Sequence, residues 1–236
     1  ATYMSGSMPF DALFLDEKKL IDAYEKHERK FLTLTPNGMI VPKRNTTLEF
    51  NGVIKAFMKI INSMNFSDLI HSWHIPLNVR IKYGRALKKN IRRARASENI
   101  HSDTWAGDSP FEIVVWLPLV NCFRTKTMYI LPPNKNDKFN KKVSKVRYSD
   151  NEKVYQLIKK DVKWIKINYG QVLIFNQSLP HGNRVNQEKE TRWTLNCRFK
   201  NTFTPYGDKK IGEFFEPITL RPISELGLKY KLPKMK

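Results

Sequence analysis

The segment "GQVLIFNQSLPHGNRVNQEKETRWTLNCRFK", residues 170–200, contains two strand-like runs separated by a polar turn. In the second run, side chains at alternate positions are expected to face the same side of a sheet. One face then carries Arg192, Thr194, Asn196 and Arg198, and the other carries Trp193, Leu195, Cys197 and Phe199. Because unpaired buried charge is costly, a core strand with four polar side chains on one face is expected to bind something. An arginine with a hydroxyl two residues later suits a carboxylate, which accepts a bidentate pair of hydrogen bonds and one more.

A second polar set lies upstream, in "ENIHSDTWAGDSPFEIVVWLPL", residues 98–119. His101 and Asp103 are two residues apart, so they are expected to project together from the end of a strand or from the turn after it. A converging imidazole nitrogen and carboxylate oxygen can hold a divalent metal, although His-x-Asp is also an ordinary surface pair. His181, at the far end of the first strand-like run, is the candidate that completes the set.

The combination of His101-x-Asp103, His181 and Arg192-x-Thr194 resembles the signature of the Fe(II)- and 2-oxoglutarate-dependent oxygenases. The nearest resemblance is to the phytanoyl-CoA-hydroxylase-like branch and its relatives in carbohydrate and antibiotic biosynthesis clusters, and it covers about residues 76–204. It implies that the two histidines and the aspartate hold Fe(II), and that the arginine and threonine hold the distal carboxylate of 2-oxoglutarate. The expected reaction is an O2-dependent dioxygenase hydroxylation centred on iron, with no separate protein acid or base.

The fold class expected from the pattern is α+β, in a single domain spanning residues 1–236. Two amphipathic helices are expected at residues 13–33 and 49–65, where apolar residues recur at helical spacing, and a short helix at 151–161. Strands are expected at residues 77–83, 111–120, 125–132, 162–167, 170–175 and 191–200. Residues 134–147 have the polar, basic profile of an exposed excursion. The resemblance implies that the core, residues 76–204, is a double-stranded β-helix or jelly roll, with the N-terminal helices (1–75) outside it and a tail at 205–236.

Five further residues are candidates for the pocket, each with an ordinary alternative. Arg198 is expected on the same face as Arg192 and is the alternative anchor for 2-oxoglutarate. Arg192 is favoured because Thr194 lies beside it. The other four are Asn196, Arg80, Asn121 and Trp105. The ordinary alternatives are a satisfied polar side chain of the strand for Asn196 and an exposed arginine for Arg80. For Asn121 the alternative is an exposed side chain at a strand end, and for Trp105 it is an aromatic residue of the core.

The formal net charge of +20 indicates either an anionic partner or a surface rich in solvated lysine. Of the 42 basic residues 29 are lysine, which favours the second reading because arginine does most bidentate phosphate recognition. Cys122 and Cys197 are far apart and lack metal-site spacing, so both are expected to be buried thiols in a reducing cytoplasm. No apolar run approaches the ~18 residues of a membrane helix, so no membrane partner is expected.

Three functions follow from these features. The first is a small-molecule hydroxylase whose substrate is a sugar or a sugar-containing metabolite. If the basic surface contributes to binding, this substrate is anionic. The second is a nucleic-acid oxygenase that tracks phosphates with basic segments 85–95 and 135–147. The third is a jelly-roll binding protein without turnover, against which the intact set of ligands argues.

Overall fold

The computed structural model describes residues 35, 38–85, 99–143, 150–201, 203–218 and 231. The expected helix at 13–33 and almost all of basic segment 85–95 lie outside the described residues. In the described part, two antiparallel sheets are combined with three α-helices, which confirms the α+β class. The helices are α3 (Thr47–Asn62), α4 (Pro133–Val143) and α5 (Asn151–Ile158).

The larger sheet has the strand order β6-β3-β8-β1-β9, and β2 also pairs with β8. Its strands are β1 (Ser72–His74), β2 (Asn78–Lys82), β3 (Ile113–Pro118), β6 (Leu173–Asn176), β8 (Arg192–Lys200) and β9 (Phe215–Pro217). The smaller sheet has the order β5-β4-β7, with β5 at Lys163–Trp164, β4 at Tyr129–Ile130 and β7 at His181–Gly182. Strand β8 is therefore the centre of the fold, because β1, β2 and β3 all pair with it.

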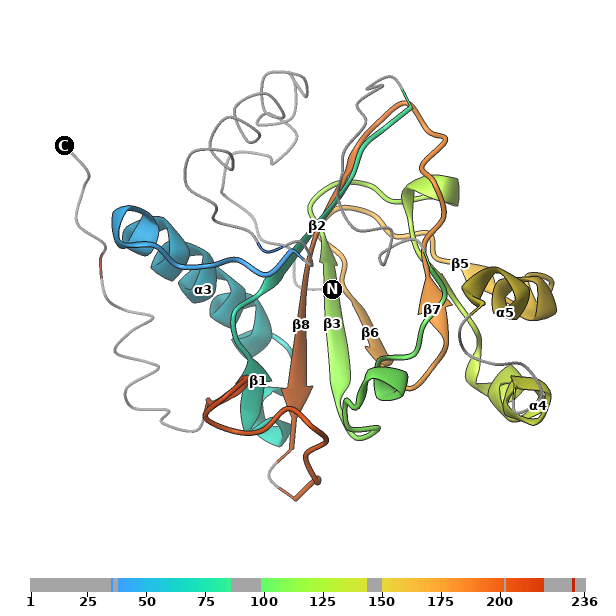
Figure 1. Ribbon diagram of the computed structural model, residues 1–236. Helices are drawn as coiled ribbons and strands as arrows, with labels where there is room; N and C mark the ends of the chain where they lie inside the picture. The colour runs from blue at the N-terminus through green and yellow to red at the C-terminus, as the bar shows by residue number, and fades with distance from the viewer. Residues whose placement is uncertain are drawn as a thin grey trace.

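Helix α3 covers the outer face of the larger sheet (Figure 1). Its apolar residues Phe57 and Ile61 are buried with Cys197 and Phe199 of β8, and the Phe57 and Phe199 rings stack at 6.3 Å between centroids. Burying each of the two helix side chains contributes about 1.5–3 kcal/mol relative to exposure. This contact confirms the predicted helix over 49–65 and, at Cys197 and Phe199, the predicted apolar face of β8. Trp193 was predicted on the same face but packs into a different core cluster, the one between the two sheets.

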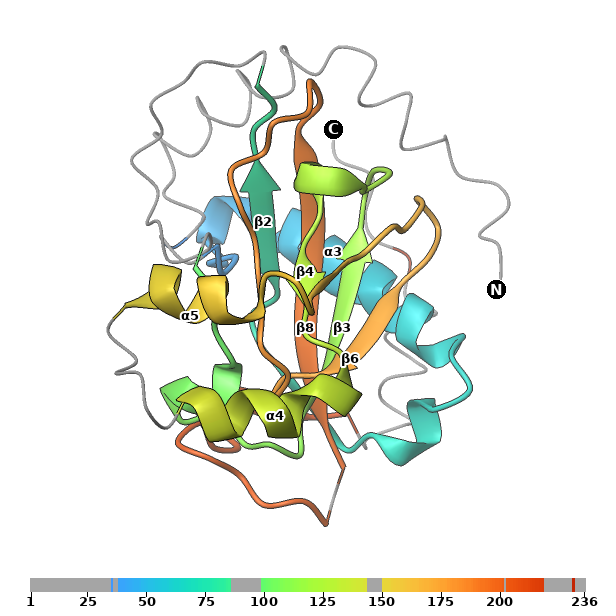
Figure 2. The same cartoon turned by 90° about the vertical axis from the view of Figure 1, so that its right-hand side faces the viewer.

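The inner face of the larger sheet packs against the smaller sheet, and α4 and α5 lie beyond the smaller sheet (Figures 1 and 2). Trp116 of β3, Phe175 of β6 and Ile130 of β4 belong to the cluster between the sheets. A third cluster joins β4 to the two helices, and its buried residues are Ile100, Tyr129, Leu131, Phe139, Val154 and Ile158. The resulting order of layers is helix, sheet, sheet and helices.

Some elements differ from their expected bounds. Residues 133–143 form α4 rather than an excursion, because Pro133 suits a first helical position and the single aromatic residue, Phe139, is buried in the cluster with α5. The larger sheet also extends beyond residues 76–204, because β1 lies before that range and β9 lies in the segment expected to be a tail.

His74, at the end of β1, is a histidine packed in the core. The residue is 2% exposed, and its ring stacks on Phe214 at 5.8 Å and meets Phe215 edge-on at 5.6 Å, both between ring centroids. Neither ring nitrogen has a hydrogen-bond partner among the described residues. Burial, reinforced by the charges of Arg198 and Lys209, lowers the pKa of His74 from 6.5 to about 3.

We expect His74→Phe to remove part of the protein's sensitivity to acid. A buried neutral histidine leaves stability intact above pH 6.5 and costs stability as the pH falls from there toward 3, since only the unfolded chain gains the proton. Between pH 7 and pH 5 the wild type should lose about 2 kcal/mol more than the variant, measured by urea unfolding at both values. An equal loss in the two proteins would contradict this account of His74.

Candidate metal centre

The backbones of His101 and His181 pair with each other across 80 positions of the chain. Each N–H donates to the carbonyl of the other residue, at 2.8 Å in both directions. Residues directly opposite in an antiparallel pair present their side chains on the same face. The two imidazole rings consequently lie side by side, with 4.3 Å between their centroids.

Asp103 joins the two histidines from the turn that follows His101. It begins the 3-10 helix η4 (Asp103–Ala106), and its backbone N–H donates to the Gln177 carbonyl at 3.1 Å. Its Oδ1 lies 3.8 Å from His101 Nε2. In the described part of the chain, one ligand atom from each of His101, Asp103 and His181 lies within 4.8 Å of the other two. The structure thus brings together the three residues predicted from the sequence to bind metal.

Both histidines are oriented by backbone carbonyls. His101 Nδ1 lies 3.1 Å from the Asn99 carbonyl, and His181 Nδ1 lies 2.8 Å from the Leu179 carbonyl. A carbonyl only accepts, so each Nδ1 carries a proton, and Nε2 is the ring nitrogen left to face a metal. Burial and the neighbouring His101 lower the pKa of His181 to about 4, so the ring is neutral at pH 7.

The Asp103 carboxylate is ionised even though it is 9% exposed. Burial acts to raise its pKa, but the charge of Arg198, with smaller contributions from the adjacent His181 and His101, outweighs burial and holds the pKa below its ordinary value. Arg198 Nη2 lies 3.1 Å from Asp103 Oδ2. Two imidazoles and one carboxylate that converge on one point fit a divalent transition metal, and they leave part of its coordination sphere open.

A network of buried polar groups, which sequence reasoning missed, holds the turn around Asp103. The Gln177 side chain donates to the Ser109 carbonyl at 2.6 Å and to Glu112 Oε2 at 2.8 Å. Ser102 Oγ donates to the Ser178 carbonyl at 3.0 Å. Glu112 is fully buried, and burial raises its pKa. The signal available in the sequence was an acidic residue placed directly before the apolar run of β3.

Arg192 is a buried cation without a carboxylate partner among the described residues. The residue is 2% exposed, and its guanidinium lies 5.8 Å above the Trp116 ring and donates from Nη1 to Asn183 Oδ1. Its Nε has no hydrogen-bond partner there. Burial lowers the pKa of Arg192 to about 10. A charge held in this way is unfavourable until an anion joins it.

Three predicted pocket residues lie close to Arg192 along the same pair of strands. Thr194 is fully buried, and its hydroxyl donates to the Arg80 carbonyl at 3.3 Å. Arg80 is half-buried and lies opposite Thr194 in the β2–β8 register. Asn196 lies two residues further along β8, and its side-chain oxygen is buried without a partner among the described residues. The predicted polar face of β8 is therefore present.

The other two candidates have contacts of a different kind. The Asn121 side chain is exposed and accepts a hydrogen bond from the Tyr169 N–H at 2.8 Å, so it holds a surface turn. Trp105 lies in η4 and is 37% exposed, with its ring 6.2 Å from that of Phe139 on α4. Among the described residues, neither contact reaches the three candidate ligands.

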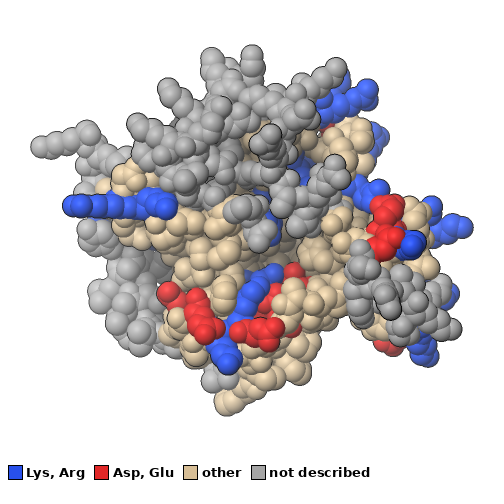
Figure 3. Space-filling view, in the orientation of Figure 1, with Lys and Arg blue, Asp and Glu red and all other residues tan. Residues whose placement is uncertain are grey.

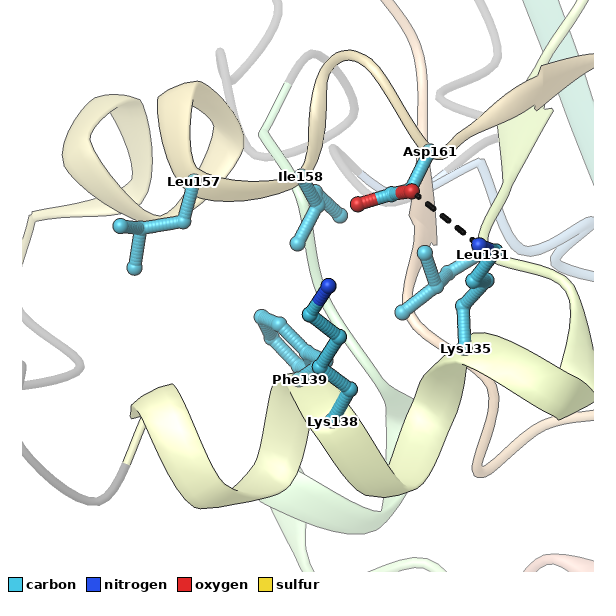
Figure 4. A pocket seen from close by; sticks show the side chains of 7 residues that line it. All are labelled: Leu131, Lys135, Lys138, Phe139, Leu157, Ile158 and Asp161. Carbon is cyan, nitrogen blue, oxygen red and sulfur yellow. Dashed lines mark ion pairs between the residues drawn. The ribbon is translucent and has the colours of Figure 1, made fainter.

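A small hollow between α4 and α5 is separate from the candidate metal centre (Figure 4). Lys135 and Asp161 form an ion pair across it at 3.7 Å. Its volume is about 10 Å³, close to the smallest space that holds one water molecule. It is therefore too small for an organic ligand.

The charges of the described side chains are mixed over the face drawn in Figure 3, where acidic groups lie beside basic ones. This face does not present an unbroken basic field in the described residues. In the same part of the chain, no helix has the length and apolar character needed to cross a membrane.

Comparison with known proteins gives likenesses of structure only. No protein-family model matches the chain, and no curated protein matches its sequence. The carbocyclase SnoK from nogalamycin biosynthesis, a non-heme alpha-ketoglutarate-dependent enzyme, aligns over 86% of this chain and 87% of its own, at 11% identity and a TM-score of 0.42. HygX from Streptomyces hygroscopicus, without ligands, aligns over 79% of both chains at 9% identity and a TM-score of 0.45.

The epimerase SnoN from nogalamycin biosynthesis, also non-heme and alpha-ketoglutarate-dependent, aligns over 67% of this chain at 13% identity and a TM-score of 0.42. The chain spans 59% of the length of SnoN and of the non-heme monooxygenase ThoJ. A likeness at these scores carries no conclusion about this chain, whose function is therefore inferred from the site itself.

Proposed function

We propose that the chain is a non-haem Fe(II)- and 2-oxoglutarate-dependent oxygenase that hydroxylates a small molecule. The observation that carries the proposal is the convergence of His101, Asp103 and His181, whose ligand atoms lie within 4.8 Å of one another. This donor set, two imidazoles and one ionised carboxylate, is the one that non-haem iron oxygenases use. Iron bound there with 2-oxoglutarate and O2 supplies the oxidising power for hydroxylation.

Arg192 is the proposed anchor for the distal carboxylate of 2-oxoglutarate. It is buried, and among the described residues it lacks a carboxylate that would balance its charge. Arg198, the alternative anchor, is already committed, because it lies within 3.1 Å of Asp103 and 3.5 Å of Asp108. Thr194 would add a hydrogen bond once its hydroxyl turns from the Arg80 carbonyl, a contact that is long at 3.3 Å.

The remaining roles of the chain are to fix geometry and to limit the access of water. The reciprocal hydrogen bonds of His101 and His181 hold the two imidazoles in one orientation, and η4 places the carboxylate beside them. The jelly-roll architecture is part of the proposal, with the two facing sheets as its walls. Trp116, below Arg192, supplies an apolar floor on which a guanidinium can stack.

The proposed substrate is a sugar or a sugar-containing metabolite. The proposed location of the enzyme is the cytoplasm. The support is the polar lining of β8 and β2, where Asn196 keeps a buried oxygen without a partner in the described chain and Arg80 lies nearby. A substrate rich in hydroxyl groups can both donate to the amide oxygen and accept from the guanidinium. Turnover of 2-oxoglutarate that rises on addition of sugar nucleotides would support this class.

An anaerobic titration tests the proposal directly. Fe(II) and then 2-oxoglutarate are added to the wild-type protein while the weak visible metal-to-ligand charge-transfer band is recorded. We expect the band to appear and to saturate at one equivalent of iron, because one set of three ligands is present in the described residues. Succinate formation on admission of O2 would then separate an active enzyme from a binding protein. Absence of both iron binding and the band would overturn the proposal.

A further inference from the structure

Four charged groups of alternating sign, Asp103, Arg198, Asp108 and Lys209, form a row from the proposed metal ligand to the segment that follows β8. Arg198 contacts Asp103 Oδ2 at 3.1 Å through Nη2 and Asp108 Oδ2 at 3.5 Å through Nη1. Lys209 Nζ in turn lies 2.8 Å from Asp108 Oδ1 and 3.0 Å from Asp108 Oδ2. The Asp108 side chain is 1% exposed, so these contacts are not screened by water in the way that surface ion pairs are.

The segment that carries Lys209 is fixed against the turn that carries Asp103. The Asp208 N–H donates to the Gly107 carbonyl at 2.8 Å, and Ser109 Oγ donates to the Pro205 carbonyl at 2.7 Å. A Cβ at Gly207 would lie 2.2 Å from the Gly107 carbonyl oxygen, so only glycine permits this approach. The position of Lys209 is therefore set by backbone contacts and not only by its charge.

The role of this arrangement follows from which oxygen of Asp103 it occupies. Arg198 binds Oδ2, whereas Oδ1 is the oxygen that lies 3.8 Å from His101 Nε2. With Oδ2 held, Asp103 can offer a single oxygen to a metal. Asp108 draws Arg198 partly away from Asp103, and Lys209 limits how strongly Asp108 does so.

We propose that Asp108 and Lys209 are positioning residues for the metal site, which act through Arg198 to keep Asp103 a ligand with one oxygen and to set its strength. This inference rests on the proposed function. Asp108 and Lys209 touch neither metal nor substrate in this scheme. The two residues act with opposite signs, which a purely structural role does not produce.

The opposite expected effects of Asp108 and Lys209 on metal affinity can be tested with Co(II). Binding of Co(II) to the full chain is measured by calorimetry and by visible absorption. In Asp108→Asn, Arg198 is no longer shared and competes with the metal for Asp103, so affinity should fall about tenfold. In Lys209→Met, Asp108 draws Arg198 further from Asp103, so affinity should rise about threefold. The double variant should match Asp108→Asn, because Lys209 acts only through the charge of Asp108.

Matched controls separate this effect of Asp108 and Lys209 on metal affinity, transmitted through Arg198, from general damage to the fold. Lys210→Met alters an exposed lysine of the same segment and should bind Co(II) as the wild type does, and Lys209→Arg should do the same because it keeps the charge. Unchanged or weaker binding by Lys209→Met overturns the inference, and so does unchanged binding by Asp108→Asn. If Asp108→Asn does not fold, Lys209→Met against Lys210→Met decides alone. A wild type that binds no Co(II) overturns the metal site itself, and this inference with it.

Discussion

Replacing Arg192 by methionine is expected to lower the affinity for 2-oxoglutarate by about 100-fold or more, while the affinity for Fe(II) stays unchanged. A bidentate pair of charge-assisted hydrogen bonds to a carboxylate is lost, at about 1.5–3 kcal/mol for each bond. The unliganded protein should at the same time become as stable as the wild type or more stable. The reason is that an unpaired buried cation is replaced by an apolar chain of similar length.

The two effects are read from the charge-transfer titration and from urea unfolding of the protein without ligands. Arg198→Met is the matched control, because it removes the other arginine of the same strand face. It should destabilise the protein, since Asp103 and Asp108 then lose a shared cation, and it should raise metal affinity, since Arg198 no longer competes with the metal for Asp103. If Arg198→Met abolishes 2-oxoglutarate binding and Arg192→Met does not, the assignment of the anchor is reversed.

Replacing His181 by alanine is expected to reduce Fe(II) affinity by more than about 100-fold, because a direct ligand counts for more than an outer partner. The fold should persist, since the backbone hydrogen bonds that hold β7 to His101 involve no side chain. Anaerobic calorimetry with Fe(II) measures the affinity, and circular dichroism confirms the fold. His71→Ala, a half-buried histidine outside the three ligands, is the control. Tight iron binding by His181→Ala would mean that the metal lies elsewhere.

Much of the candidate site was predictable because it depends on local spacing. The i, i+2 rule placed Arg192, Thr194 and Asn196 on one face of β8, and the structure has them there. The His-x-Asp pair was expected at a strand end or in the turn after it, and the backbone bridge at His101 followed by η4 agrees with that expectation. Helix α3 was found from its 3.6-residue period.

The contacts that depend on tertiary structure were beyond the sequence. Asp108, Glu112 and Lys209 look like ordinary surface charges in a chain with a net charge of +20. Asp108 and Glu112 are buried and Lys209 is partly buried against Asp108, and no period or spacing in the sequence predicts these contacts. Helix α4 was missed for a related reason, since Phe139 is its one apolar side chain in a core cluster of the described residues. The jelly-roll architecture and the roles of the individual site residues remain predictions.

The pairing of His101 with His181 also determines when the site can exist during biosynthesis. A nascent chain that has emerged only as far as β6 contains two of the three ligands and lacks the strand that aligns them. Closing a loop of that length is an entropic cost that the packed sheets must offset before the imidazoles meet. A metal bound at this site would therefore bind late in folding, where it would stabilise the finished architecture and would not guide the chain toward it.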